Sequence, residues 1–308
     1  MRIVSFICFL LFVSICFALD TVIWNSGDDT VLGQFNYNDP SYGADARLTL
    51  GGVSYSSKAQ ASAYNYATST LTLMVTYPDS SVAFVTVDCA RWSLIAVKKV
   101  EPGNDWAGLQ YDQTSNQNSL LGVGLANGLL YISRINPVTG DVNVWAKLQG
   151  ILKSTAFVKS SQTFVVTINT PAGVTAVYMF DSAGQITKNL EPTFAKVPEG
   201  YLFQSGPYIT TYVPTYNAVI SLINFKKGDQ FYDNFAYFAP SQAAFSISTM
   251  SIDVSAEKVI MVADQTGQEY LYAIAKRSDG VYNFYVYNLA TASMFKRQTI
   301  NTPVLAMF

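Results

Sequence analysis

Histidine is absent from the 308-residue sequence, and cysteine is scarce. The absence of histidine excludes Ser-His-Asp and Cys-His nucleophilic catalysis and the usual zinc and copper sites. Of the three cysteines, Cys8 and Cys16 fall in the apolar N-terminal run, which leaves Cys89 for the remainder of the chain. That remainder cannot form an intramolecular disulfide, so a large hydrophobic core has to stabilise it. We interpret Cys89 as a buried thiol, with an intermolecular disulfide as the alternative.

Charged residues are also few, at 13% of the chain, which is about half the usual share. The formal net charge is −2, and no cluster of lysine and arginine is larger than a pair. Nucleic acid and anionic membranes are therefore not expected as partners. No Asn-x-Ser/Thr sequon occurs, so N-glycosylation is not expected either.

The first residues have the pattern of a secretory signal peptide. Met1-Arg2 precedes an apolar run from Ile3 to Phe17, and Ala18 offers a small residue for cleavage. We predict a signal peptide over 1–18 and a mature domain over 19–308; an uncleaved signal anchor is the alternative. Later apolar runs are too short for a membrane span of ~20 residues. We therefore expect a secreted, extracellular protein, or alternatively one in the endolysosomal lumen.

The mature chain reads as strands separated by tight turns. Apolar runs of strand length recur, such as Leu71–Tyr77 and Phe164–Ile168, and aromatic residues make up 14% of the sequence. Turn residues such as Asn127-Gly128 and Asp279-Gly280 separate these runs. No stretch of ten or more residues has convincing helical periodicity, so the fold class is predicted to be all-β.

A longer repeat organises these strands. A short strand, a polar corner and a strongly apolar strand recur in that order, and the sixth short strand ends the chain. The six equivalent positions are Tyr66, Asp112, Lys159, Val213, Val254 and Phe308. Their spacings are 46, 47, 54, 41 and 54 residues. A period of roughly 40–50 residues with four strands per unit is typical of β-propeller blades.

The two ends of the chain predict how the ring closes. The mature chain starts in the middle of a unit, and Val304–Phe308 at its other end stands alone. We therefore predict a single propeller, most simply of six blades, whose N- and C-terminal strands share the closing blade. Seven blades, or two stacked β-sandwiches, are the alternatives. The turn Asn136-Pro137-Val138-Thr139-Gly140 resembles the Asp-Pro-x-Thr-Gly corners of many propellers, without indicating a specific family.

Candidate binding residues come from the loops expected at one face of the ring, where the linkers into each blade meet the turns between second and third strands. They are Glu101, Asp105, Trp106, Glu191, Asp229, Asp264 and Glu269. A ring of carboxylates could hold Ca²⁺, and a pair could perform acid–base chemistry. The alternative is that these are solvated turn residues. Trp106 could stack on a ligand or could pack between blades.

We expect a secreted binding module for a carbohydrate or an extracellular protein, with no cofactor other than a possible Ca²⁺. The alternative is a secreted hydrolase or lactonase that uses carboxylates and Ca²⁺, which the resemblance to propellers allows because some six-bladed propellers are lactonases of that kind. A structural coat protein is a third hypothesis. No catalytic residue can be assigned from the sequence.

Overall fold

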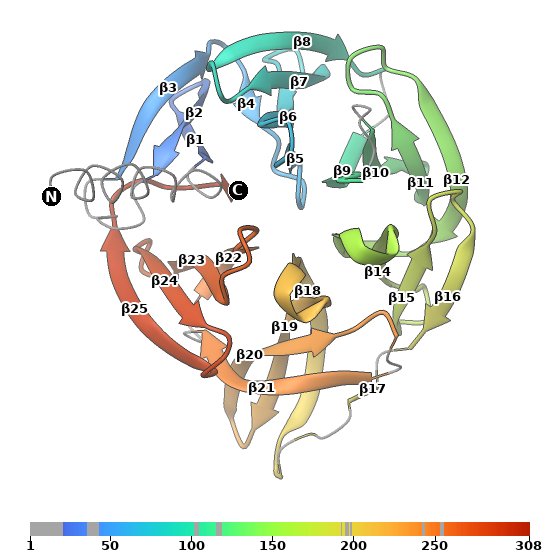
Figure 1. Cartoon of the computed structure of the whole chain (residues 1–308), viewed down its shortest axis with the longest axis vertical. Coiled ribbons are helices and arrows are strands. Elements are labelled where there is room, and N and C mark those ends of the chain that lie inside the picture. Colours follow the sequence, from blue (N-terminus) through green and yellow to red (C-terminus); the bar gives the residue numbers. More distant parts are fainter. Residues whose placement is uncertain are drawn as a thin grey trace, which may run out of the picture.

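Six β-sheets surround a central axis and form a six-bladed propeller (Figure 1). The computed structural model describes residues 21–35, 43–101, 105–114, 119–191, 193–194, 197, 199–241, 244–252 and 256–308. The predicted fold class and blade number are confirmed, and the two-sandwich alternative is wrong. The predicted signal peptide lies outside the described residues. Within them, the structure contains no helix with the length and apolar character that a membrane crossing requires.

Both ends of the chain contribute to the first blade, as predicted. From the axis outward it consists of β26 (Ala306–Met307), β1 (Thr21–Ser26), β2 (Asp29–Phe35) and β3 (Ala44–Leu50). Met307 pairs with Val22. The amide of Leu305 donates to the carbonyl of Ile23 at 2.7 Å, and that of Phe308 donates to Thr21 at 3.0 Å. The ring is thus closed by hydrogen bonds between the two ends of the chain.

The other five blades each use one continuous segment, again from the axis outward. Blade 2 has a divided inner strand and consists of β4 (Ser54–Tyr55) and β5 (Ser62–Asn65), then β6 (Thr70–Thr76), β7 (Val82–Asp88) and β8 (Ser93–Lys99). Blade 3 consists of β9 (Asp105–Tyr111), β10 (Leu120–Ala126), β11 (Leu129–Ile135) and β12 (Val142–Gln149). Blade 4 consists of β13 (Ile151–Val158), the 3₁₀ turn η2 (Lys159–Ser161), β14 (Thr163–Asn169), β15 (Thr175–Phe180) and β16 (Ile186–Leu190).

Blades 5 and 6 complete the ring. Blade 5 consists of β18 (Leu202–Val213), the 3₁₀ turn η3 (Pro214–Tyr216), β19 (Ala218–Lys227), β20 (Gln230–Phe238) and β21 (Ala244–Ile252), with the short β17 (Thr193–Phe194) added parallel to β21. Blade 6 consists of β22 (Ala256–Ala263), β23 (Tyr270–Arg277), β24 (Tyr282–Asn288) and β25 (Ser293–Ile300).

One element of the predicted repeat is misplaced. The fifth inner strand was expected to end at Val254, but the inner strand of blade 6 is β22, which ends at Ala263. Part of the expected segment belongs to β21, the outer strand of blade 5, and residues 253–255 lie outside the described residues. The residues that follow the six inner strands are Tyr66, Asp112, Lys159, Pro214, Asp264 and Phe308. Their spacings of 46, 47, 55, 50 and 44 residues make the repeat more regular than predicted.

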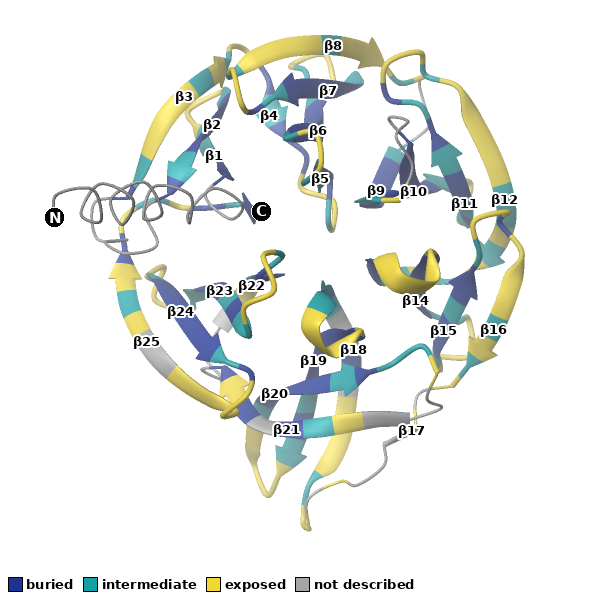
Figure 2. Ribbon diagram, in the orientation of Figure 1, coloured by how far each residue is buried: buried dark blue, intermediate teal, exposed yellow. Residues whose placement is uncertain are grey.

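Burial follows each strand's place in its blade (Figure 2). Strand β6 is buried at six successive positions, whereas no residue of the outer strand β8 is buried. Middle strands have a neighbouring blade on both faces, so both sets of alternating side chains leave water. This explains why the sequence has continuous apolar runs rather than an alternation of apolar and polar residues.

Two glycine turns lie against the preceding blade. Gly140, at φ +84°, lies against the side chain of Lys98 of β8, and Gly184, at φ +82°, lies against the ring of Trp145 of β12, which leaves no room for a side chain at Gly184. Asn136 fixes the first turn, since its Oδ1 accepts from the amides of Val138 and Thr139 at 3.0 and 3.2 Å. The propeller-like turn Asn136–Gly140 therefore helps to join blade 3 to blade 2.

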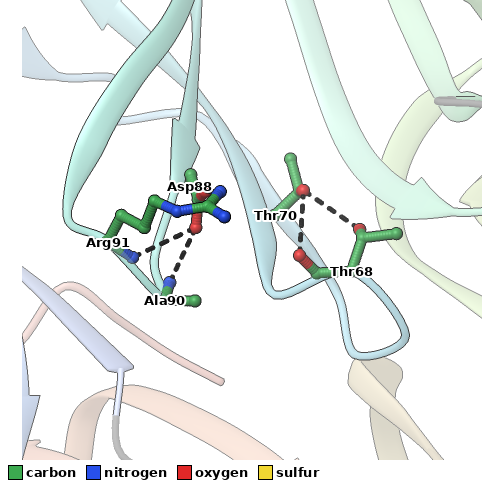
Figure 3. Close-up of polar contacts among 5 residues, drawn as sticks. All are labelled: Thr68, Thr70, Asp88, Ala90 and Arg91. Carbon is green, nitrogen blue, oxygen red and sulfur yellow. Dashed lines mark hydrogen bonds and ion pairs between the residues drawn. The ribbon is translucent and has the colours of Figure 1, made fainter.

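Asp88 organises the corresponding turn of blade 2 (Figure 3). Its Oδ1 accepts from the amides of Ala90 and Arg91 at 2.9 and 3.1 Å, and its Oδ2 pairs with the Arg91 guanidinium at 2.8 Å. Partial burial raises the pKa of Asp88, but the hydrogen bonds and the charge of Arg91 outweigh it and hold that pKa below its ordinary value. The ionised carboxylate is therefore the form that stabilises this turn.

We predict that Asp88→Asn lowers the free energy of unfolding by about 1 kcal/mol at pH 7, because the charged hydrogen bond to Arg91 is lost. A carboxyl whose pKa is depressed by folding contributes stability above its unfolded pKa, near 3.9, and loses it as the pH falls through the folded pKa. The difference between variant and wild type should therefore shrink below about pH 4. Urea unfolding at pH 7 and pH 3 measures it, and an equal difference at both pH values would contradict this account.

Candidate functional site

The seven candidate residues lie on two opposite faces of the ring. We call the face with the linkers between blades and the turns between second and third strands the linker face, and the opposite one the turn face. The linker face carries Glu101, Asp105, Trp106, Glu191 and Asp229, whereas Asp264 and Glu269 both follow the inner strand β22 on the turn face. The expectation that all seven share one face is wrong, because it depended on the misplaced fifth repeat.

Asp105 and Trp106 are occupied by contacts within the fold. The Asp105 carboxylate forms an ion pair with Lys58 at 2.8 Å. Trp106 is 6% exposed and packs against Phe84 with ring centroids 6.2 Å apart. The packing interpretation of Trp106 is therefore the one that the structure supports. Glu101 and Glu191 are exposed, in linkers after β8 and β16.

The centre of the ring is crossed by the loop 56–61, which interrupts the inner strand of blade 2. Gln60 Oε1 accepts from the Thr155 amide at 2.7 Å, and Gln60 Nε2 donates to the Thr155 carbonyl at 2.9 Å. The Thr210 hydroxyl donates to that same carbonyl at 2.6 Å. Since these residues belong to blades 2, 4 and 5, a hydrogen-bonded bridge spans the axis.

The turn face carries the same tripeptide twice, Asp112-Gln113-Thr114 after β9 and Asp264-Gln265-Thr266 after β22. In each copy the aspartate Oδ1 accepts from the threonine amide, at 3.1 Å in the first and 2.7 Å in the second. The threonine hydroxyl also donates to that oxygen, at 2.6 and 2.5 Å. The two turns are thus built alike three blades apart.

The glutamine of each tripeptide joins its turn to the preceding blade. Gln113 Nε2 donates to the Tyr64 carbonyl at 2.7 Å, and Gln265 Nε2 donates to the Tyr212 carbonyl at 3.3 Å. Tyr64 and Tyr212 are in the inner strands of blades 2 and 5. These glutamines join neighbouring inner strands at the end where those strands reach the turn face. We call this end of the ring's centre, surrounded by the residues that follow the inner strands, the channel mouth.

Aromatic side chains surround this mouth. Tyr64 stacks on Phe308 at 5.9 Å between centroids and lies 5.1 Å from Tyr66. Burial raises the pKa of the Tyr66 phenol, as do its neighbours Tyr64 and Asp264 through their charges. The Tyr216 hydroxyl donates to Glu269 at 3.0 Å; burial is the main reason that the pKa of Tyr216 is raised, and Glu269 adds to it.

Blade 5 has a second aromatic group, at its outer end. Strands β18, β19 and β20 are longer than most others, and the tip of their sheet extends past the outer strand β21 (Figure 1). We call this tip the blade-5 projection, and its residues are Tyr201, Leu202, Phe203, Phe225, Lys226, Lys227, Asp229, Gln230, Phe231 and Tyr232. Leu202, Phe203 and Phe231 are 66%, 39% and 49% exposed. Apolar side chains are thus exposed to solvent at the tip of a protruding sheet.

The strand register distributes these residues over both sides of the projection. Leu202, Lys226 and Phe231 are directly paired and share one side. The other side carries Tyr201, 5.4 Å from Tyr232 between centroids. A lysine covers a ring on each side: the Lys226 ammonium lies 5.6 Å from Phe231, and that of Lys227 lies 4.9 Å from Tyr201. These distances are within the range of cation–π attraction.

No protein-family model and no curated protein sequence matches the chain. Solved structures do match it. Hydrazine synthase of Kuenenia stuttgartiensis has a TM-score of 0.51 and 14% sequence identity, over 84% of this chain and 71% of that chain. A protein from Lactobacillus plantarum has a TM-score of 0.50 and 10% identity, over 93% of this chain and 83% of that chain, and the Dos1 propeller has a TM-score of 0.48 and 12% identity, over 80% of this chain and 64% of that chain. At such identities the likeness concerns the fold alone.

Sequence reasoning did not identify several of these features. The repeated Asp-Gln-Thr was a detectable signal, and it would have placed the inner strand of blade 6 correctly. Gln60 gives no local signal, because its partner Thr155 is 95 positions away. Among the described residues, no three Asp, Glu or Cys side chains are grouped as metal ligands. Calcium binding stays a prediction.

Proposed function

We propose that the protein is a secreted propeller binding module that binds an acidic carbohydrate on the blade-5 projection. Secretion rests on the N-terminal sequence pattern. The exposed aromatic rings beside two lysines are the observation that supports the binding site. Single exposed apolar residues are ordinary on a protein surface, whereas a cluster of them usually serves an interaction.

The chemistry of the projection suits a sugar. Aromatic rings offer apolar faces for the C–H faces of a pyranose, and polar groups at the rim fix its hydroxyls. On the side that carries Tyr201, the Tyr232 hydroxyl donates to Gln230 Oε1 at 2.6 Å, so polar groups lie next to the aromatic rings there. Asp229, in the exposed turn of the same hairpin, provides a carboxylate that can accept from sugar hydroxyls.

The lysines favour an acidic sugar over a neutral one. Lys226 and Lys227 stand one on each side of the projection in a protein whose net charge is −2. Their ammonium groups can pair with carboxylate or sulfate groups of the ligand, and such charge-assisted bonds are stronger than neutral ones. An extracellular protein with an acidic surface is the alternative partner.

The test is a glycan array that includes uronate-containing and sulfated sugars, probed with the mature protein. We expect a subset of acidic glycans to bind and Phe231→Ala to reduce their signal at least tenfold, since an exposed ring can be removed without unfolding the blade. Leu94→Ala is the matched control, because Leu94 is 51% exposed on β8 of another blade. Its signal should stay at the wild-type level.

Two results would reject the proposal. Glycan binding that survives Phe231→Ala would place the sugar site elsewhere. An array without any bound glycan, together with cross-linking of the projection to an extracellular protein, would favour the protein partner. The hydrolase or lactonase alternative has less support, because the candidate carboxylates divide between two faces.

A further inference from the structure

The two Asp-Gln-Thr turns differ in how their carboxylates are neutralised. Asp112 is buried, and its Oδ2 pairs with the Arg134 guanidinium at 3.3 Å. Asp264 is 4% exposed, and its Oδ1 likewise accepts hydrogen bonds from the threonine of its own turn, Thr266. No lysine or arginine in the described part of the chain lies within ion-pair distance of Asp264, and no described residue donates to its Oδ2.

The strand register shows which residue of blade 6 is equivalent to Arg134 of blade 3. Arg134 reaches Asp112 from β11. In the strand register Arg134 pairs with Leu121, the residue after Leu120. In blade 6 the residue after Leu271 is Tyr272, which pairs with Val286. Leu120 and Leu271 are equivalent positions in their blades. Leu120 pairs with Tyr111, the residue before Asp112, and Leu271 pairs with Ala263, the residue before Asp264. Val286 therefore occupies the position of Arg134, and it carries no charge.

The surroundings of Asp264 suit a cation from outside. Asp264 has lost most of its contact with water, and its Oδ2 has no hydrogen-bond donor among the described residues, whereas in the turn of blade 3 a guanidinium pairs with the equivalent oxygen. Asp264, Phe308 and Tyr66 each follow the inner strand of their blade, in the consecutive blades 6, 1 and 2. They therefore lie at the same end of neighbouring inner strands, on the turn face. The rings of Tyr64, Tyr66 and Phe308 gathered there can attract a cation by their faces.

We infer that Asp264 is the anchor of a second binding site, on the turn face, for the ammonium or guanidinium group of a ligand. The cation pairs with Asp264 Oδ2 and lies against the aromatic rings of the channel mouth. It takes the place that Arg134 fills within blade 3. Such a group can come from a free amine or from a lysine or arginine side chain of another protein. This site is on the opposite face from the blade-5 projection and does not depend on the carbohydrate proposal.

Calorimetric titration of the mature protein tests this site with putrescine, methylguanidine and the peptide acetyl-Gly-Lys-Gly-amide, at constant ionic strength. We expect saturable binding of at least one probe and a loss of at least tenfold in affinity for Asp264→Asn. The asparagine keeps an oxygen for the turn; Asn65 shows that an amide can do this, since its Oδ1 accepts from the Ala67 amide at 3.0 Å. A thermal melt of the variant verifies that it is folded.

Asp112→Asn is the matched control, because it removes the charge from the twin turn and should leave probe affinity within about twofold of wild type. A peptide that binds at least tenfold more tightly than putrescine identifies a protein side chain as the source of the cation, and equal affinities identify a small amine. The inference is overturned if no probe binds, if Asp264→Asn binds like wild type, or if sodium chloride alone gives the same heats.

Discussion

A variant that lacks residues 304–308 is expected to lose cooperative folding of the whole ring. Those residues supply the inner strand of blade 1, and Val304, Ala306 and Met307 are at most 7% exposed. Burial of one valine or methionine side chain contributes about 1.5–3 kcal/mol. Their loss, together with that of two backbone hydrogen bonds, is comparable with the total stability of a domain, about 5–15 kcal/mol. Circular dichroism during heating should show a broad transition or none.

Single substitutions separate the loss of the strand from the loss of its side chains. Met307→Ala keeps the backbone pairing with Val22 and should cost about 2–5 kcal/mol while the transition stays sharp. Addition of the peptide 301–308 to the truncated protein should restore part of the cooperative transition. If the truncated protein melts at the wild-type temperature, the closure of the ring does not depend on this strand.

The propeller could be predicted because the sequence pattern of one blade, apolar strands separated by tight turns, is repeated along the chain. Each blade buries both faces of its middle strands, so each contributes apolar runs such as β6 and β14, and tight turns separate them at a regular period. The assignment of one inner strand could not be made in this way. Strands β21 and β22 both contain enough apolar residues to be read as strands, and only residues 253–255 separate them. Local pattern does not distinguish the outer strand of one blade from the inner strand of the next.

The candidate sites were harder to predict, because the partner of a polar residue is set by tertiary contacts. Asp105 reads as a free carboxylate in a polar loop, but it pairs with Lys58 from the preceding blade. Trp106 follows it and is buried over Gly124, where a side chain would crowd the ring at 3.3 Å. Phe231 was not singled out from the sequence. It lies near the start of β20 and is 49% exposed because the end of this strand extends past the outer strand β21.

Replacement of Gln60 is expected to have the second-largest effect on stability, because this one side chain connects blades across the axis. Gln60→Ala and Gln60→Asn should each lower the free energy of unfolding by about 2–4 kcal/mol, since the buried Thr155 amide loses its acceptor. Gln60 has a φ of 49°, which alanine tolerates poorly and asparagine tolerates better. Asparagine is one methylene too short to reach Thr155. Similar losses in both variants would thus identify the bridge, not the backbone, as the cause.

Gln110→Ala provides the control in chemical denaturation. Gln110 Nε2 also approaches Thr155, but only at 3.4 Å from its carbonyl and 3.3 Å from its hydroxyl, and the Thr155 amide keeps its acceptor. Its loss should cost less than about 1 kcal/mol. The propeller has side-by-side contacts between neighbouring blades and, through Gln60, a contact between blades that are not neighbours. If Gln60→Asn unfolds at the same denaturant concentration as Gln110→Ala, the neighbour contacts alone hold the ring, and the loop 56–61 only fills its centre.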